Sequence, residues 1–326
     1  MKAWQIHELG EPKESLTLEE IKAPEPMSGQ LLIEVEAVGL AFPDVLQCRG
    51  EYQVKPPLPF IPGGETSGTV IAVGEEVEDF SVGQKVIALG GGLAEKTLVH
   101  AQMSFCVPDS MDMIKAAALP MNYGTTWFAL HDRALIQSGE TLLVTGASGG
   151  TGSAAIQLGL AAGAKVIAVA GGQEKVEACR ELGADFVIDH TEEGDLVEKV
   201  REITNNQGVD VAYDPVGGET FQKVRRCMAW NGRLLVIGFV AGIPELATNH
   251  VLLKNYSVVG VHWGASLGRD PSSFKRQMSS VLELAKTGEV DPLMHPTYTF
   301  DSANDALQDI ADRKVVGKVV VDLTKS

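Results

Sequence analysis

Apolar runs alternate with longer helical stretches through the middle of the chain. The run Leu142–Val144 predicts a buried strand, Thr151–Ala162 predicts a helix of small residues, and Val166–Val169 predicts a second strand. The same alternation continues with expected strands at 186–188, 210–213, 233–237 and 256–261 and expected helices at 173–181, 194–203 and 217–227. Because strands joined by helices pair in parallel, the pattern predicts an α/β fold with a doubly wound parallel sheet.

The flanking regions follow a different pattern. Short expected strands at 2–6, 31–38, 68–73, 85–88 and 96–99 are separated by glycine and proline, with a short helix near 43–47. This spacing predicts a small barrel-like domain over roughly the first third of the chain. After a helix at 125–135 and the alternating region, the tail predicts a helix at 272–286, a helix opened by Asp301 as N-cap, and strands at 297–300 and 317–322. This α+β tail could return to the first domain.

A glycine-rich turn follows the first strand of the alternating region. Gly146, Gly149 and Gly152 give GxxGxxG, a variant of the dinucleotide-binding fingerprint. Such a turn lets the backbone approach a pyrophosphate, and the helix after it presents free N–H groups. The uncharged stretch Thr141–Ala164 could instead suggest a membrane span, but its six glycines make it too weakly hydrophobic.

Composition narrows the class of protein. The 326 residues carry 44% hydrophobic and 21% charged side chains, which is typical of a globular protein. A net charge of −16 without basic clusters argues against nucleic acid or an anionic membrane as partner. Four scattered cysteines without a CxxC pair indicate a reducing compartment, and no apolar signal segment opens the chain. We therefore expect a cytoplasmic protein.

The end of the second strand bears on cofactor choice. NAD-binding units place an acidic residue there for the ribose hydroxyls, but this chain reads Ala170-Gly171-Gly172. Lys175 could supply a countercharge for a 2′-phosphate, and His190 after the third strand could reach the same place. A solvated helix lysine is the alternative for Lys175. The sequence favours NADPH over NADH.

Six motifs in order carry a family resemblance. They are VGLAFPDVLQCRGEY (38–52), LPFIPGGETSGTV (58–70), LPMNYGTTWFAL (119–130), VTGASGGTGSAAIQLG (144–159), YDPVGG (213–218) and GKVVVDL (317–323). The chain resembles the medium-chain dehydrogenases/reductases, most closely the zeta-crystallin-like quinone oxidoreductases. The resemblance implies a GroES-like catalytic domain at 1–120 and 263–326 with a Rossmann NADP(H)-binding domain inserted at 121–262. It also implies an active site in the cleft between these domains and a homodimer formed through the edge strand of the Rossmann sheet.

The departures from the family pattern bear on metal chemistry. Zinc-dependent members place cysteine at the Ala41 position and histidine at the Gly64 position, and their four-cysteine structural lobe is absent here. Glu65 alone does not make a zinc site. We expect no metal, which argues against alcohol oxidation and favours an acceptor that needs no metal, a quinone or an α,β-unsaturated carbonyl.

The resemblance also assigns residue roles. Tyr52 lies where related enoyl-thioester reductases carry a proton-donating tyrosine, and Asp44 is a second catalytic candidate, although it could simply cap a helix. The expected substrate cleft residues are Phe42, Asn122 and Tyr123. The expected cofactor-binding residues are Thr125, Gly146, Gly149, Gly150, Thr151, Gly152, Gly171, Gly172, Lys175, His190, Gly238, Phe239, Val240, Val261, His262, Trp263 and Arg313.

Three functions remain open at this point. The first is a zinc-independent, NADPH-dependent quinone or enone reductase, although the asparagine and tyrosine usual in quinone oxidoreductases are Ala41 and Leu46 here. The second is an enoyl-thioester reductase for acyl-CoA or acyl carrier protein, which would need a basic docking patch that the acidic sequence lacks. The third is a non-catalytic NADPH-binding protein.

Overall fold

The computed structural model describes residues 1–325, which form two compact units. The first unit contains Met1–Met121, Asp270–Ser279 and the residues from Met294 onward, and the second contains Asn122–Arg269 and Ser280–Leu293. The sequence assigned all of 263–326 to the first domain. The structure instead groups 263–269 and 280–293 with the second unit, because Trp263 packs over Gly124 and the Asp291 carbonyl accepts a hydrogen bond from Gln157.

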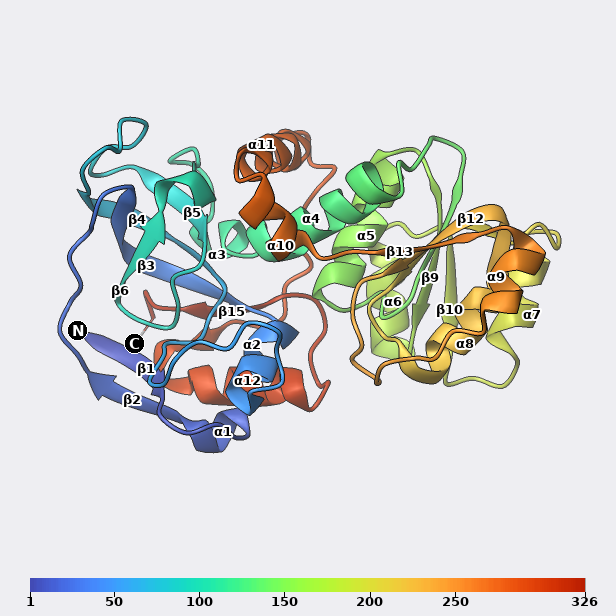
Figure 1. Ribbon diagram of the computed structural model, residues 1–326, viewed down its shortest axis with the longest axis horizontal. Coiled ribbons are helices and arrows are strands. Elements are labelled where there is room, and N and C mark those ends of the chain that lie inside the picture. Colours follow the sequence, from blue (N-terminus) through green and yellow to red (C-terminus); the bar gives the residue numbers. More distant parts are fainter. Residues whose placement is uncertain (326) are drawn as a thin grey trace. The chain divides into compact units, whose positions relative to one another are not determined.

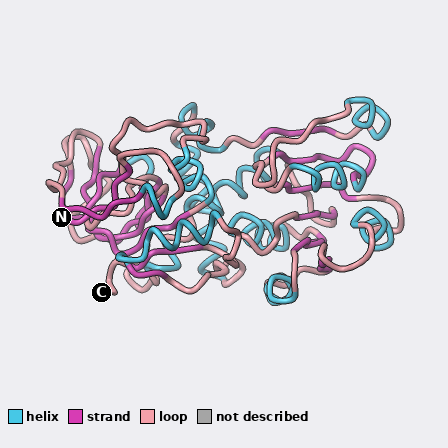
Figure 2. Tube along the Cα trace, turned by 90° about the horizontal axis from the view of Figure 1, so that it is seen from below, coloured by secondary structure: helices cyan, strands magenta, loops and turns pink. Residues whose placement is uncertain are grey.

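The second unit is built on a six-stranded parallel sheet with the order β10-β9-β8-β11-β12-β13. Its strands are β8 Thr141–Val144, β9 Lys165–Ala170, β10 Phe186–Asp189, β11 Val209–Asp214, β12 Met228–Val236 and β13 Ser257–Gly260. The connecting helices are α5 Gly150–Ala161, α6 Gln173–Glu181, α7 Leu196–Ile203, α8 Gly218–Cys227 and α9 Thr248–Lys254, followed by α10 Trp263–Arg269. Figure 2 shows these strands, in magenta, flanked by helices in cyan. The predicted doubly wound parallel sheet is confirmed.

The strand order indicates where this sheet can bind a ligand. The chain starts in the middle at β8, moves outward to β9 and β10, and then returns to β11 on the other side of β8. In open α/β sheets the crevice outside the carboxyl ends of the strands at such a reversal is where ligands bind. The loops after β8 and β11 are therefore the expected site.

The first unit contains a sheet with the order β14-β15-β3-β4-β5-β7, and β6 also pairs with β3. The strands are β3 Gln30–Leu40, β4 Glu65–Val73, β5 Lys85–Leu89, β6 Lys96–His100, β7 Ser104–Cys106, β14 Tyr298–Thr299 and β15 Val319–Asp322, and β1 Lys2–Ile6 pairs with β2 Leu16–Glu20. The helices are α1 Pro12–Ser15, α2 Phe42–Arg49, α3 Met113–Ala116 and α12 Ala303–Ala311, and α11 Ser272–Thr287 is divided between the two units after Ser279. The closing strand β15 runs antiparallel to β3, so the end of the chain does return to the first unit (Figure 1).

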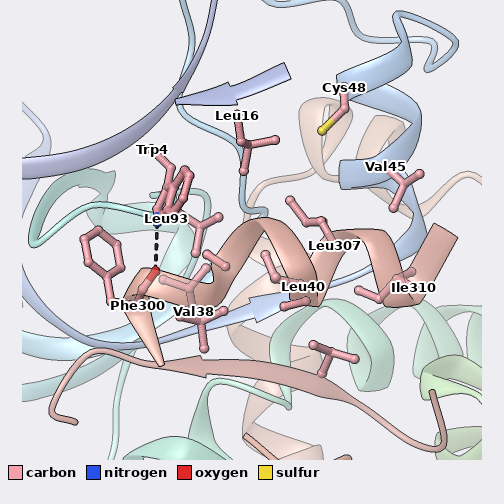
Figure 3. Packing of buried hydrophobic residues seen from close by; sticks show 14 of the residues in the cluster. Trp4, Leu16, Val38, Leu40, Val45, Cys48, Leu93, Phe300, Leu307 and Ile310 are labelled. Carbon is pink, nitrogen blue, oxygen red and sulfur yellow. Dashed lines mark hydrogen bonds between the residues drawn. The ribbon is translucent and has the colours of Figure 1, made fainter. Parts of the chain in front are cut away.

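A buried apolar core fixes α2 in the first unit. Figure 3 shows Val45 and Cys48 of α2 and Leu307 and Ile310 of α12 among its members. At the other end of the cluster the Trp4 indole donates a 2.8 Å hydrogen bond to the Phe300 carbonyl. Because the apolar core fixes one face of α2, the polar residues of this helix, including Asp44, also have a defined position.

Two helix predictions need correction. The helix expected at 125–135 begins earlier, as α4 Pro120–Trp127, because proline is favoured in the first turn, and it continues as a π-helical segment over Phe128–Arg133. The last long helix does not start at Asp301. A short 3₁₀ turn over Phe300–Ser302 comes first, and Ser302 is the N-cap of α12. Within residues 1–325, no helix combines the length and hydropathy that a membrane span requires.

Candidate active site and nucleotide-binding site

The glycine turn after β8 has the geometry that a dinucleotide fingerprint requires. Gly146 adopts a φ of +56°, which favours glycine, and a Cβ at Gly152 would collide with the Gly146 carbonyl oxygen. The helix that follows, α5, has Gly149 as its N-cap and no side-chain cap. The N–H groups of its first turn, at Gly150, Thr151 and Gly152, are therefore open to an anion.

A carboxylate to which the sequence analysis assigned no role braces this turn. Asp214 ends β11, and its Oδ1 accepts hydrogen bonds from the Thr145 hydroxyl at 2.6 Å, from the Val216 N–H at 3.0 Å and from the Gly217 N–H at 3.3 Å. Burial raises the pKa of Asp214, while these three donors oppose the shift. One side chain thus ties the loops after β8 and β11 together at the reversal of strand order.

Residues of α4 pack against the start of α5. The Asn122 side chain covers Gly150 so closely that a Cβ there would overlap its amide. The Thr126 hydroxyl lies 2.9 Å from the buried Tyr213 hydroxyl and 3.4 Å from the Thr151 carbonyl. Thr125, its neighbour, is half-buried. These contacts position α4 relative to the expected pyrophosphate site.

Tyr123 has a different environment from the one expected for a cleft residue. It is 2% exposed, and its hydroxyl donates a 2.6 Å hydrogen bond to Gln157 of α5. Gln157 in turn donates to the Asp291 carbonyl at 2.6 Å. Its hydroxyl is thus held by a bond that stabilises the second unit, and the assignment of Tyr123 to the substrate cleft stays a prediction.

The turn after β9 carries the residues expected around the adenosine phosphate. His190 lies beside Gly171, where a Cβ would come 2.6 Å from the His190 Nε2. Gly172 is the N-cap of α6 with a φ of +86°, and Lys175 is half-buried in the first turn of that helix. Gly171, Gly172, Lys175 and His190 therefore lie on one turn and the strand end next to it.

The remaining cofactor candidates fall on three loops. The loop after β12 contains Gly238, Phe239 and Val240, and Val240 donates to the Pro215 carbonyl of the loop after β11 at 3.4 Å. Val261 and the exposed His262 follow β13, and Trp263 is 4% exposed. Arg313 belongs to the first unit, after α12, with a φ of +59°. The roles of these residues toward a cofactor stay predictions.

In the first unit Asp44 caps α2. Its Oδ2 accepts a 2.8 Å hydrogen bond from the Ala41 N–H, and the side chain is 3% exposed. Burial raises the pKa of Asp44 to about 6, an effect that the Ala41 N–H and the Lys318 charge reduce and that the Glu65 charge increases. Asp44 therefore makes the capping contact, and its raised pKa lets the same carboxyl group hold a proton up to about pH 6.

Phe42 and Cys48 belong to this helix, and Tyr52 follows it. Tyr52 is half-buried after α2, and burial together with the Asp44 charge raises the pKa of its phenol. Phe42 packs against the apolar core of the unit. Burial raises the pKa of the Cys48 thiol to about 12, so this cysteine is not a thiolate nucleophile.

A buried ion pair lies near Asp44. Lys318, directly before β15, pairs with Glu65, the first residue of β4, and their side chains are 3% and 1% exposed. The other Glu65 oxygen accepts a 2.6 Å hydrogen bond from the Met121 N–H. A Cβ at Gly64 would lie 3.6 Å from the Asp44 Oδ1. Residue 64, where zinc-dependent enzymes carry a histidine, thus faces Asp44.

The comparisons with known proteins agree with this arrangement. Residues 27–109 match the model of the alcohol dehydrogenase GroES-like domain, and residues 150–287 match that of the zinc-binding dehydrogenase. A quinone oxidoreductase-like protein 2 homolog from Nematostella vectensis is 38% identical to this chain over 98% of it and 88% of the relative. The chain belongs to the quinone oxidoreductase family of the medium-chain dehydrogenases/reductases.

Two further relatives describe the range of this family. Quinone oxidoreductase from Rattus norvegicus is 30% identical, with 95% of this chain and 94% of the relative covered. A mycobacterial protein solved in complex with NADPH is 29% identical, with 99% and 100% of the two chains covered and a TM-score of 0.92. This quinone oxidoreductase family member is therefore an oxidoreductase with a nucleotide-binding fold.

The family model that matches residues 150–287 is described as zinc-binding, but the two positions where zinc-dependent members are expected to carry cysteine and histidine lie outside that range and are Ala41 and Gly64 here. No group of three or more His, Cys, Asp or Glu residues within 1–325 is arranged to hold a metal ion. The nucleotide site, in contrast, fits a dinucleotide, since no side chain caps the N-terminus of α5 and the close approach of Gly152 to the Gly146 carbonyl gives the tight turn of the fingerprint.

Sequence reasoning missed three charged residues that shape these sites. Asp189 and Asp214 each end an apolar strand, and a polar residue at the carboxyl end of a parallel strand is a recognisable signal. Lys318 stands in the apolar run GKVVVDL, where a lone lysine is unusual in a buried strand. Its partner Glu65 was considered only as a carboxylate that does not by itself make a zinc site.

Proposed function

We propose that this member of the quinone oxidoreductase family is a zinc-independent, NADPH-dependent reductase of quinones or α,β-unsaturated carbonyls. One observation carries the proposal. At the positions where the zinc-dependent members of the superfamily are expected to carry cysteine and histidine, the chain has Ala41 and Gly64, and Gly64 lies beside a buried carboxyl, Asp44, whose pKa is raised to about 6. A site of this kind can hold a proton but has no ligand set for a Lewis acid.

The chain's own residues would bind the cofactor and donate the proton that the reduced acceptor takes up. The free N–H groups of the first turn of α5 face the pyrophosphate position, and Lys175 supplies positive charge for a 2′-phosphate. Bound NADPH supplies hydride to the acceptor. Tyr52 and Asp44, both on or next to α2, are the proton donors for the oxygen that gains charge.

The test is NADPH oxidation by the purified chain with a panel of quinones and enones. We expect turnover above background, a lower KM for NADPH than for NADH, and a loss of about 10²-fold in kcat in Tyr52→Phe if the phenol is the acid. The matched control is Tyr298→Phe, a tyrosine of the first unit bonded to Asp309, which should retain activity.

Two results would replace the proposal with one of its alternatives. Much higher efficiency with crotonyl-CoA than with every quinone would make the chain an enoyl-thioester reductase. Tight NADPH binding without oxidation by any acceptor, and without an effect of Tyr52→Phe, would make it a non-catalytic NADPH-binding protein.

We also propose a homodimer formed through β13. In this unit β13 pairs with β12 on one side, and the Val261 N–H donates to the Val236 carbonyl of β12, so the backbone N–H and C=O groups of Val258 point away from β12. An exposed sheet edge of this kind can pair with a second copy. Light scattering should give twice the 34.7 kDa chain mass, and Val258→Pro should give the monomer. A monomeric wild type would contradict the proposal.

A further inference from the structure

Asp189 brings a carboxylate to the turn after β9, although the sequence has no acid there. It ends β10, the neighbouring strand, and its Oδ1 accepts from the Thr191 hydroxyl at 2.6 Å, the Thr191 N–H at 2.8 Å and the Gly172 N–H at 3.1 Å. Its Oδ2 shares the Gly172 N–H at 3.2 Å. The side chain thus joins the end of the third strand to the turn that follows the second.

The carboxylate of Asp189 is ionised and can still accept a further hydrogen bond. The hydroxyl and N–H of Thr191 and the N–H of Gly172 lower the pKa of Asp189 to about 2, so it is ionised at physiological pH. Oδ1 takes three donors, whereas Oδ2 accepts from Gly172 alone within the described chain and keeps lone pairs for another donor. A Cβ at Gly172 would meet no heavy atom within 4 Å, so the turn has open space beside it.

This carboxylate lies where doubly wound folds place the residues that recognise the ribose of the cofactor. An acidic residue at the end of the second strand takes the ribose hydroxyls of NAD, and a positive residue takes the 2′-phosphate of NADP. Here Lys175, which is positive, the imidazole of His190 and the carboxylate of Asp189 all lie on the Gly171–Gly172 turn, in the helix turn that follows it or at the strand end beside it. The site therefore contains recognition groups for both cofactors.

We propose that Asp189 is a specificity-determining residue that accepts a ribose hydroxyl and limits the preference for NADPH over NADH. This inference rests on the proposed nucleotide-binding function. The negative charge of Asp189 repels a 2′-phosphate held by Lys175, whereas its carboxylate accepts a hydrogen bond from the unphosphorylated ribose of NADH. The chain accordingly accepts both cofactors, and the balance between them is set by Asp189.

The experiment measures binding of cofactor fragments by calorimetry, without any acceptor. Wild type, Asp189→Asn and Thr191→Val are titrated with adenosine 2′,5′-bisphosphate and with AMP. Asparagine keeps an oxygen for the Gly172 and Thr191 donors but removes the charge. We expect Asp189→Asn to raise the ratio of affinities for the bisphosphate over AMP by about tenfold, the effect of one nearby like charge in a partly exposed site.

Thr191→Val is the control for a merely structural role. It removes one hydrogen bond to Asp189 and leaves the carboxylate charge, so we expect the affinity ratio to stay at its wild-type value. Equal weakening of both fragments in Asp189→Asn would show that Asp189 only braces the turn and would overturn the inference while leaving the nucleotide site intact. If wild type binds neither fragment, the proposed function fails as well.

Discussion

Replacing Lys318 by methionine is expected to lower the free energy of unfolding by about 3–5 kcal/mol, the range for leaving one member of a buried ion pair alone. The side chains of Lys318 and Glu65 are 3% and 1% exposed, so water cannot solvate the Glu65 carboxylate once its partner is gone. Asp44 adds a second negative charge to the same region, since both Lys318 and Glu65 influence its pKa. Urea unfolding followed by circular dichroism measures the loss.

The control for this prediction is a second lysine on the same segment. Lys314 pairs with Asp312 at 2.7 Å and Asp309 at 3.5 Å, but its side chain is 63% exposed. Lys314→Met should therefore cost at most about 1 kcal/mol. The double variant Lys318→Met/Glu65→Gln should recover much of the lost stability, because it removes the orphaned charge and keeps an acceptor for the Met121 N–H. Equal costs for Lys318→Met and Lys314→Met would contradict the argument.

Much of the fold could be predicted because its signals are local. The parallel strands are short apolar runs separated by helices of the right length, and α6 has the predicted bounds, Gln173–Glu181. The start of the last helix, α12, was harder to predict. Asp301 is a good N-cap residue by type, but Phe300 is drawn into the apolar core with Trp4, so a 3₁₀ turn forms first and Ser302 becomes the cap. Tertiary packing decided the helix start there.

The candidate sites were predictable in proportion to how local they are. The Gly146–Gly152 turn follows from one segment, because the steric conflict between a Cβ at Gly152 and the Gly146 carbonyl is set by residues six apart. The Glu65–Lys318 pair joins residues that are far apart in the sequence, and they meet because β3 pairs with β4 on one side and with β15 on the other. Asp189, at the end of β10, likewise reaches Gly172 after the adjacent strand β9. Its position at a strand end can be recognised in the sequence, but the contact it makes with another segment leaves no spacing to recognise.

The pH dependence of stability provides the second large expected effect, through Asp44. Its folded pKa is about 6, above the ordinary value of 3.8 that applies in the unfolded chain. Between these values the folded protein keeps a proton that the unfolded chain has lost, so raising the pH favours unfolding. Wild type should therefore lose about 2 kcal/mol relative to Asp44→Asn as the pH rises from 4 to 7, and the difference should be nearly constant above that window.

Measuring the difference between the two proteins cancels the titration of all other groups that both share. Lys318, Glu65, Tyr52 and Cys48 lie close enough to Asp44 for their charges to interact with it, and all are present in both proteins. The control is Asp79→Asn, whose carboxylate is 77% exposed and pairs with Lys275, and its difference from wild type should stay flat over the same range. A flat difference for Asp44→Asn would mean that Asp44 is ionised throughout. It would then be a helix cap that holds no proton near neutral pH, and Tyr52 would be left as the proton donor of the proposed reaction.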